Sequence, residues 1–289
     1  MEPLSSIRIK NLFSKFSFLI PQIRLILLVS SFIIIELLIN VKVSSYFTAL
    51  TWGKFGEETK ELPLGIIAGG HADGSVSIWN AAQLLSEAAK EARGKSNFGC
   101  ISMKKFHENQ VNDIKFNPFK SNLLASCGRD IYVHNIDKLS LNDPLKCSNI
   151  QQDSEMTSLN WNDKVQYILA SATSNGTVFV WDMRKQAATV QIYDQYSHND
   201  NKRYVKTIVM WYPENPVQVV IAYDDPEMNY LHLYDIRQPT APCGEFYGSP
   251  SRSIFEFNLN PNDNSLLLTT GRDNIVACWN MKTVRINVI

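Results

Sequence analysis

The stretch ILASATSNGTVFVWD, residues 168–182, contains the pattern that decides the fold. Its first, apolar half is followed by Asn175-Gly176, a pair that favours a tight hairpin because glycine takes a positive φ without a Cβ clash. The second half has apolar residues at every other position, the period expected of a β-strand, and it ends in Trp181-Asp182. The stretch therefore predicts a β-hairpin closed by an aromatic residue and a carboxylate.

The same hairpin pattern recurs along the chain. Its five copies run from Ile66 to Asn80, Leu123 to Asn135, Ile168 to Asp182, Val219 to Asp235 and Leu266 to Asn280. Each copy follows a short strand whose large apolar residue is, in turn, Trp52, Phe116, Trp161, Trp211 and Leu259, at intervals of 64, 45, 50 and 48 residues. A period of roughly 40–50 residues ending in an aromatic and an acid or amide is typical of WD repeats, which fold as four-stranded blades.

All six tryptophans fall on these repeat positions, so we expect an all-β WD-repeat β-propeller with five recognisable blades. We expect one indole per hairpin to be buried at equivalent places, at Trp79, Trp181 and Trp279. Two copies depart from the pattern, because one ends in His134-Asn135 and another reaches Tyr234 after a longer turn. The expected structural repeat positions are Trp52, Trp79, Trp161, Trp181, Asp182, Trp211, Tyr234, Asp235 and Trp279.

Two segments interrupt the repeat texture. Residues 81–93 have good helix composition and predict a helical insertion between the first two units. Residues 1–45 hold an apolar stretch, 16–39, that follows three basic residues and is broken by a proline and two charges. A membrane-spanning helix needs about 20 predominantly apolar residues. Three readings of this N-terminal segment stay open.

One reading is a signal peptide or signal anchor. Another is a marginal transmembrane helix that inserts residues 16–39 directly into a membrane. The third, which we rank first, is a buried or artefactual segment from an alternative exon or gene model. We therefore separate residues 1–45, an apolar and in one reading helical segment, from residues 46–289, the propeller.

Composition excludes several function classes. The 28 Lys and Arg residues balance the 28 Asp and Glu residues, so no excess of basic charge indicates nucleic-acid binding. The five cysteines have no C-x-x-C spacing and are odd in number, which predicts neither a zinc site nor a disulfide framework. Scattered thiols favour a reducing compartment, most simply the cytosol.

Few residues suggest catalysis, and we predict no enzyme activity, no cofactor and no metal site. His71 lies two residues before Asp73 and is expected to decorate a solvent-facing hairpin. His107 lies near the place of a structural histidine in WD blades, and a blade hydrogen-bond network with Asp130 is expected there. His198 and Asp200 lack a third metal ligand nearby. Asn175 matches a glycosylation acceptor, which only a lumenal chain would use.

The repeat units also resemble one family. The segments that carry the resemblance are FNPFKSNLLAS (116–126), WN (161–162) with VQYILASA (165–172), WDMRK (181–185), LYDIR (233–237), and GRD (271–273) with CWN (278–280). Together they are similar to the WD-repeat scaffold subunit of the COPII vesicle outer coat (the Sec-thirty-one family). The resemblance implies a seven-bladed propeller, truncated here at both ends, that scaffolds the cytosolic coat at endoplasmic reticulum exit sites.

The same resemblance implies the partners: a smaller WD-repeat protein, other cage subunits, and the membrane only peripherally, through the coat. Two alternatives stay open, a WD-repeat adaptor in another complex and a membrane-anchored propeller. A propeller avoids exposed sheet edges by closing its ring. Five blades of a seven-bladed family therefore predict a chain that is marginally stable and prone to associate.

Overall fold

The computed structural model describes eleven parts of the 289-residue chain. These are residues 43–55, 62–86, 96–147, 154–193, 206–224, 231–246, 254–260, 263, 265–271, 274–282 and 285–288. The apolar stretch 16–39 lies outside them, and so do His198 and Asp200. No helix within the described ranges is long and apolar enough to cross a membrane.

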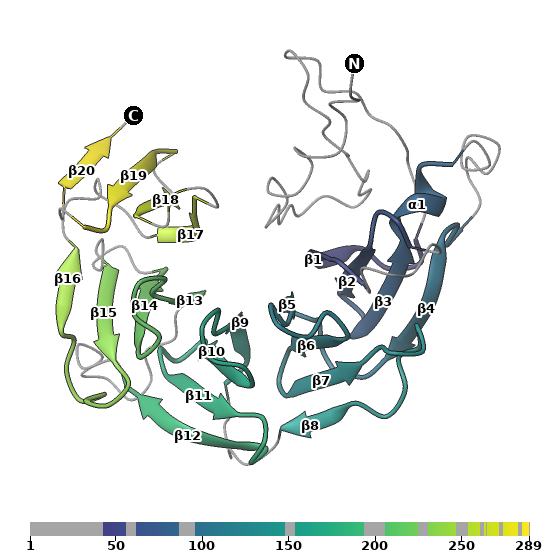
Figure 1. Cartoon of the computed structure of the whole chain (residues 1–289), viewed down its shortest axis with the longest axis horizontal. Helices are drawn as coiled ribbons and strands as arrows, with labels where there is room; N and C mark the ends of the chain where they lie inside the picture. The colour runs from purple at the N-terminus through teal and green to yellow at the C-terminus, as the bar shows by residue number, and fades with distance from the viewer. Residues whose placement is uncertain are drawn as a thin grey trace, which may run out of the picture. The chain divides into compact units, whose positions relative to one another are not determined.

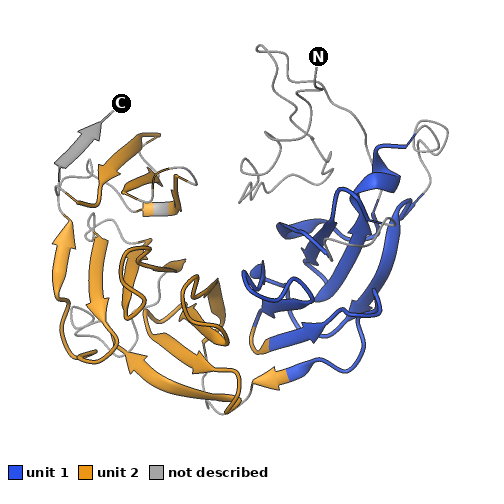
Figure 2. Cartoon of the chain, viewed as in Figure 1, with its two compact units in different colours: residues 1–128, 132–145 blue, residues 129–131, 146–289 orange. Residues whose placement is uncertain are grey.

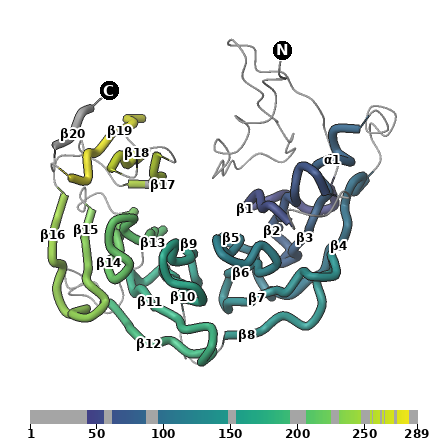
Figure 3. The backbone as a smooth tube through the Cα atoms, in the orientation of Figure 1, coloured from purple at the N-terminus to yellow at the C-terminus, as the bar shows by residue number. Residues whose placement is uncertain are grey.

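The described residues form five four-stranded sheets, as the repeat predicts, and one short helix (Figure 1). Each sheet is a meander in which consecutive strands lie side by side, and the tube in Figure 3 follows this order. The sheets are numbered here as blades 1 to 5 along the chain. The all-β prediction is therefore confirmed.

Blades 1 and 2 contain the first eight strands. Blade 1 consists of β1 (Phe47–Gly53), β2 (Ile66–His71), β3 (Ser75–Asn80) and β4 (Cys100–Lys105). Blade 2 consists of β5 (Asp113–Phe116), β6 (Leu123–Cys127), β7 (Ile131–Asn135) and β8 (Leu145–Cys147).

Blades 3 to 5 contain the remaining strands. Blade 3 consists of β9 (Met156–Trp161), β10 (Ile168–Thr173), β11 (Val178–Asp182) and β12 (Ala187–Ile192). Blade 4 consists of β13 (Thr207–Trp211), β14 (Gln218–Tyr223), β15 (Leu231–Asp235) and β16 (Gly244–Phe246). Blade 5 consists of β17 (Ile254–Leu259), β18 (Leu266–Gly271), β19 (Val276–Asn280) and β20 (Arg285–Val288).

The chain divides into two compact units, coloured separately in Figure 2. The first unit comprises residues 1–128 and 132–145, and the second comprises residues 129–131 and 146–289. Blade 1 and most of blade 2 belong to the first unit, and blades 3, 4 and 5 belong to the second.

The hairpins between the second and third strands use the predicted turn chemistry. Gly74 and Gly176 have φ of 87° and 86°, values that favour glycine. At Gly74 the close approach of the chain adds a second requirement, because a Cβ there would lie 2.1 Å from the carbonyl oxygen of His107. Asn175 accepts hydrogen bonds from the Thr177 amide and the Thr173 hydroxyl, so its side chain is part of the turn.

The helical insertion is shorter than predicted where it can be followed. The described part of segment 81–93 contains only α1 (Ala81–Leu84), and the structure describes nothing from 87 to 95. The helix begins where Asn80 caps it, because the side-chain oxygen accepts from the amides of Ala82 and Gln83. The composition of residues 81–93 predicted a helix but did not indicate the residue at which the helix ends.

Each unit has cores formed where blade faces meet. In the second unit, one apolar cluster joins blades 3 and 4, and another joins blades 4 and 5. In the first unit, a cluster that includes Ile66, Ile78 and Ile114 joins blades 1 and 2. The strands in these cores have both faces buried, which explains their nearly continuous apolar runs.

Candidate functional site

The repeat positions build a buried pair of an indole and a hydroxyl. Trp181 and Trp279 are fully buried, on β11 and β19. Trp181 Nε1 donates to Ser171 Oγ at 2.9 Å, and Trp279 Nε1 donates to Thr269 Oγ1 at 2.8 Å. A buried indole needs a partner for its N–H group. The hydroxyl of the neighbouring strand supplies that partner, and this fixes the ring against the buried face of its own blade.

Blade 1 reaches the same result with a different hydroxyl. The position equivalent to Ser171 is Gly69, where Phe47 fills the space that a side chain would occupy. Ser77, directly opposite Gly69, takes over and accepts from Trp79 Nε1 at 2.7 Å.

His71 extends this chain of hydrogen bonds and corrects a prediction. It was expected on a solvent-facing turn, but β2 continues through it and the side chain is fully buried. Its Nδ1 lies 3.1 Å from the carbonyl oxygen of Ser45, and its Nε2 lies 2.7 Å from Ser77 Oγ. Because a carbonyl oxygen only accepts, we assign the ring proton to Nδ1, so that Nε2 accepts from the Ser77 hydroxyl. Burial lowers the pKa of His71, which favours this neutral form.

Blade 2 replaces the indole by an imidazole. His134 is fully buried, and Ser126 Oγ lies 2.9 Å from Nε2 of both His134 and His107. A hydroxyl donates only one hydrogen bond, so two neutral rings here are complementary when one Nε2 carries a proton and the other accepts. Burial, with His107 nearby, lowers the pKa of His134 to about 3.

The expected network around His107 therefore forms in part. His107 and Ser126 take part, whereas Asp130 forms an ion pair with Lys146, with Oδ2 2.8 Å from Nζ. The Asp130 carboxylate thus forms an ion pair with β8, the following strand, where the sequence had predicted a hydrogen bond to His107.

Blade 4 has an aromatic cluster at these positions. Tyr234 is fully buried, and Ile221 stands where blades 3 and 5 carry a hydroxyl. The ring of His232 stacks on Tyr234 with centroids 6.0 Å apart, and it forms a T-shaped pair with Tyr223 with centroids 5.6 Å apart.

The acid or amide after each ring forms a second repeated feature. In all five blades its side-chain oxygen accepts from the amide two residues on, at distances of 2.9–3.1 Å. The pairs are Asn80 with Ala82, Asn135 with Asp137, Asp182 with Arg184, Asp235 with Arg237 and Asn280 with Lys282. Asparagine and aspartate favour such turns, because their short side chains mimic a backbone acceptor.

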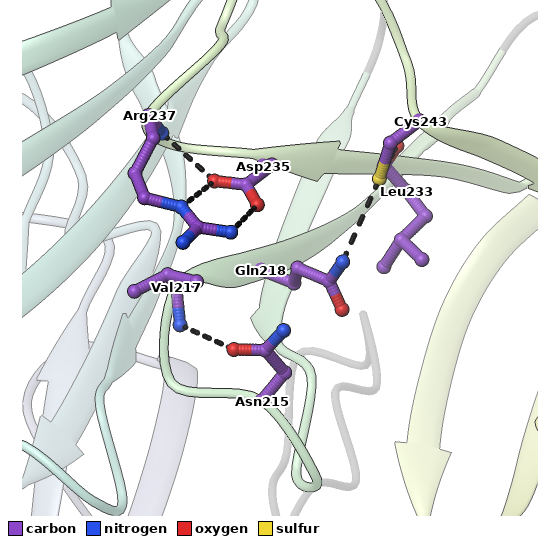
Figure 4. Close-up of polar contacts among 7 residues, drawn as sticks. All are labelled: Asn215, Val217, Gln218, Leu233, Asp235, Arg237 and Cys243. Atoms are coloured by element: carbon purple, nitrogen blue, oxygen red, sulfur yellow. Dashed lines mark hydrogen bonds and ion pairs between the residues drawn. The ribbon is translucent and has the colours of Figure 1, made fainter.

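Blades 3 and 4 reinforce this corner with an arginine. Arg237 donates from Nε at 2.9 Å and from a terminal nitrogen at 2.5 Å to the two carboxylate oxygens of Asp235 (Figure 4). Hydrogen bonding to Arg237 lowers the pKa of Asp235 to about 2. Arg184 makes the same bidentate pair with Asp182, whose pKa is also lowered. Both guanidinium groups lie mostly in solvent, which screens the two charges. Each ion pair therefore contributes little to the stability of the fold.

The geometry of these polar groups indicates a structural role. A serine beside a histidine can act as a nucleophile, but Ser77 and Ser126 are fully buried and each is engaged by two ring nitrogens. Across the described residues, no group of three or more His, Cys, Asp or Glu side chains is placed to hold a metal ion. The arrangement fixes the buried rings within their own blades.

Sequence reasoning missed the hydroxyls, although a signal for them exists. Ser171 and Thr269 each lie ten residues before their tryptophan, and Ser126 lies eight before His134 across a turn two residues shorter. A search for Ser or Thr ten residues before each ring, or eight where the turn is two residues shorter, would have found all three.

Five four-stranded meanders with buried rings define a class of protein, the WD-type β-propeller. A family model described as "Nucleolar protein 10-like, N-terminal domain", a β-propeller domain, matches residues 96–288, and the chain belongs to this family of domains. Pairwise comparison is more specific. Protein transport protein SEC31 of Dictyostelium discoideum is 31% identical over 244 residues, 82% of this chain and 17% of that protein. Protein transport protein Sec31B of Mus musculus is 32% identical over 249 residues, 84% of this chain and 20% of that protein.

The solved structure "COPII on membranes, outer coat vertex" has a similar fold, with a TM-score of 0.68. The match has 23% identity and covers 87% of this chain and 62% of that one, so it shows the fold alone. The sequence relatives identify the chain as a Sec31-family N-terminal propeller region. The chain spans 17–20% of the length of these two curated relatives.

Proposed function

We propose that this chain is a structural scaffold and protein-interaction component of the COPII vesicle coat in transport from the endoplasmic reticulum to the Golgi. The observation that carries the proposal is similarity to Sec31 transport proteins across 82–85% of the chain. The fold supports it, because the same region is built like a chain of the COPII outer coat vertex.

The blades are the structural elements of this scaffold. Buried rings such as Trp181 and Trp279 are each held by a hydroxyl, and the loops between strands are left to vary. The proposed partners are a smaller WD-repeat coat subunit and neighbouring cage subunits. Residues 46–289 act as the propeller region on the cytosolic side of endoplasmic reticulum exit sites, without catalysis, and reach the membrane through the coat.

Liposome flotation tests this function against its two alternatives. The purified full chain is mixed with liposomes that carry assembled COPII coat proteins, or with bare liposomes, and an unrelated WD propeller serves as the control. We expect the chain to float only with the coat. Flotation on bare liposomes would instead support direct insertion of residues 16–39. A chain that floats in neither condition overturns the coat proposal and favours an adaptor of another complex.

A further inference from the structure

The hairpin turn of blade 3 contains the only asparagine-glycine pair in the 289-residue sequence, Asn175-Gly176. Asparagine is a thermolabile residue, because its side-chain amide can be lost. The loss is easiest before glycine, since no Cβ hinders the approach of the next backbone nitrogen to the carboxamide. The pair is therefore the position at which this chain is chemically most susceptible to deamidation.

Deamidation at this pair joins one backbone nitrogen to one side-chain carbon. The Gly176 nitrogen loses its proton and attacks Cγ of Asn175. The new N–Cγ bond closes a succinimide ring, and the Cγ–Nδ2 bond breaks as ammonia leaves with the proton. Water then opens the ring at either carbonyl. One product is aspartate with the ordinary backbone, and the other is isoaspartate, whose backbone runs through Cβ and Cγ.

The folded turn holds both reacting groups in other contacts. The Gly176 amide donates to the carbonyl oxygen of Thr173 at 3.0 Å, so its proton is engaged. The side-chain oxygen of Asn175 accepts from the Thr177 amide at 3.1 Å and from the Thr173 hydroxyl. Gly176 and Thr177 are buried, which limits the access of water. Attack requires the carboxamide to turn towards Gly176, and that movement breaks its two hydrogen bonds.

The turn is also fixed to the rest of blade 3. The Ser174 amide donates to the carbonyl oxygen of Glu155 at 2.9 Å, and the Thr173 amide donates to that of Thr177 at 3.0 Å. The two strands that the turn joins, β10 and β11, are buried along almost their whole length. The contacts that restrain Asn175 are therefore released only when this hairpin opens.

Blade 1 indicates which product the turn accepts. Its own turn carries Asp73-Gly74 at the same place, and Asp73 Oδ1 accepts from the Ser75 amide at 3.0 Å, as Asn175 accepts from Thr177. An aspartate at position 175 therefore keeps the turn. An isoaspartate link adds a carbon to the backbone between two paired strands and displaces the acceptor, so it is incompatible with this hairpin.

We propose that Asn175-Gly176 is a modification site that the folded hairpin of blade 3 keeps unreactive and that becomes reactive when the hairpin opens. The substrate is the chain itself, and water is the co-reactant. Copies that stay open are converted in part to isoaspartate and cannot form blade 3 again. The pair thus turns a reversible opening of blade 3 into an irreversible one, and no coat partner takes part.

The test compares deamidation of the full chain in its folded and unfolded states. The chain is incubated at mildly alkaline pH with and without guanidinium chloride, and proteolysis with mass spectrometry measures aspartate and isoaspartate at residue 175. A synthetic peptide of residues 170–180, incubated in both solutions, corrects for the effect of the denaturant on the chemistry. After this correction we expect the folded chain to react at least about tenfold more slowly, because only its opened fraction reacts.

Refolding distinguishes the two products. The unfolded, partly deamidated chain is returned to buffer without denaturant, and size-exclusion chromatography separates the compact fraction from the chain that has not refolded. We expect the compact fraction to contain aspartate at residue 175 and the other fraction to be enriched in isoaspartate. Asn175→Asp is the matched control. It should refold as well as the unmodified chain, because the added charge leaves the turn intact.

Two results contradict the proposal. Equal corrected rates in the folded and unfolded chain would show that the turn gives no protection. Equal isoaspartate content in the compact and non-refolded fractions would show that the altered backbone does not prevent blade 3 from forming. Because these assays contain no coat protein, either result leaves the proposed coat function unaffected, and a failed flotation assay leaves this site unaffected.

Discussion

Replacing His134 by tryptophan should remove a pH-dependent weakness of blade 2. The folded blade keeps His134 neutral down to a pKa of about 3, because burial and His107 disfavour the charged ring. Unfolding returns the side chain to its ordinary pKa of 6.5. Below that pH the unfolded chain binds a proton that the folded chain does not, so the free energy of unfolding falls as the pH drops from 6.5 towards 3.

The expected loss at pH 5.0 is about 2 kcal/mol, from 1.36 kcal/mol for each of roughly 1.5 pH units below 6.5. His134→Trp places at this position the ring that blade 3 carries at Trp181, with its N–H directed at Ser126 as Trp181 is directed at Ser171. The variant lacks the titrating group and should lose about 2 kcal/mol less than the unmodified chain between pH 7.5 and 5.0.

Urea unfolding at the two pH values, followed by far-ultraviolet circular dichroism, measures this difference. Comparing the change with pH within each protein cancels any packing cost of the larger ring. Tyr193→Trp, at an exposed position, controls for adding a tryptophan. If His134→Trp and the unmodified chain lose the same stability on acidification, the buried neutral imidazole is not the cause and the reasoning is wrong.

Further substitutions test the turns, the rings and the corners by thermal or urea unfolding. Gly74→Ala should cost well over 1 kcal/mol, because φ is positive and the chain approaches closely, whereas Gly244→Ala, whose added Cβ has ordinary contacts of 3.6 Å, should change stability little. Trp181→Phe should cost about 1–3 kcal/mol by removing the N–H that Ser171 accepts, and a cost below 0.5 kcal/mol would contradict the assigned pair. Arg237→Ala should leave the unfolding midpoint nearly unchanged, since its guanidinium is mostly exposed, and a clear fall in the midpoint would show that the corner depends on the arginine.

The blades could be predicted from the sequence because their determinants are local. A hairpin such as 168–182 contains its own turn residues, its own strand period and its own closing ring. The acid or amide after the ring is local in the same sense, because Asp182 accepts from the backbone amide only two residues on.

The errors concern contacts between segments distant in the sequence. His71 was placed on a turn because Asp73 lies two residues on, but the carbonyl oxygen of Ser45, 26 residues earlier, accepts a hydrogen bond from its ring. Asp130 was assigned to His107, whereas its ion pair is with Lys146 on a later strand. Neither partner is indicated by spacing, since each depends on which strands become neighbours after folding.

The side-chain oxygen at the end of each third strand also indicates where an extra segment can be inserted into the chain. At Asp182 this oxygen closes a tight turn, and at Asn80 the same kind of oxygen begins a helix. The same kind of acceptor is thus compatible with a turn or a helix after the strand. The strand before it keeps its register in both cases. These corners are therefore natural points for inserting a tag or a foreign domain, because the added segment begins on a satisfied hydrogen bond and leaves the sheet unchanged.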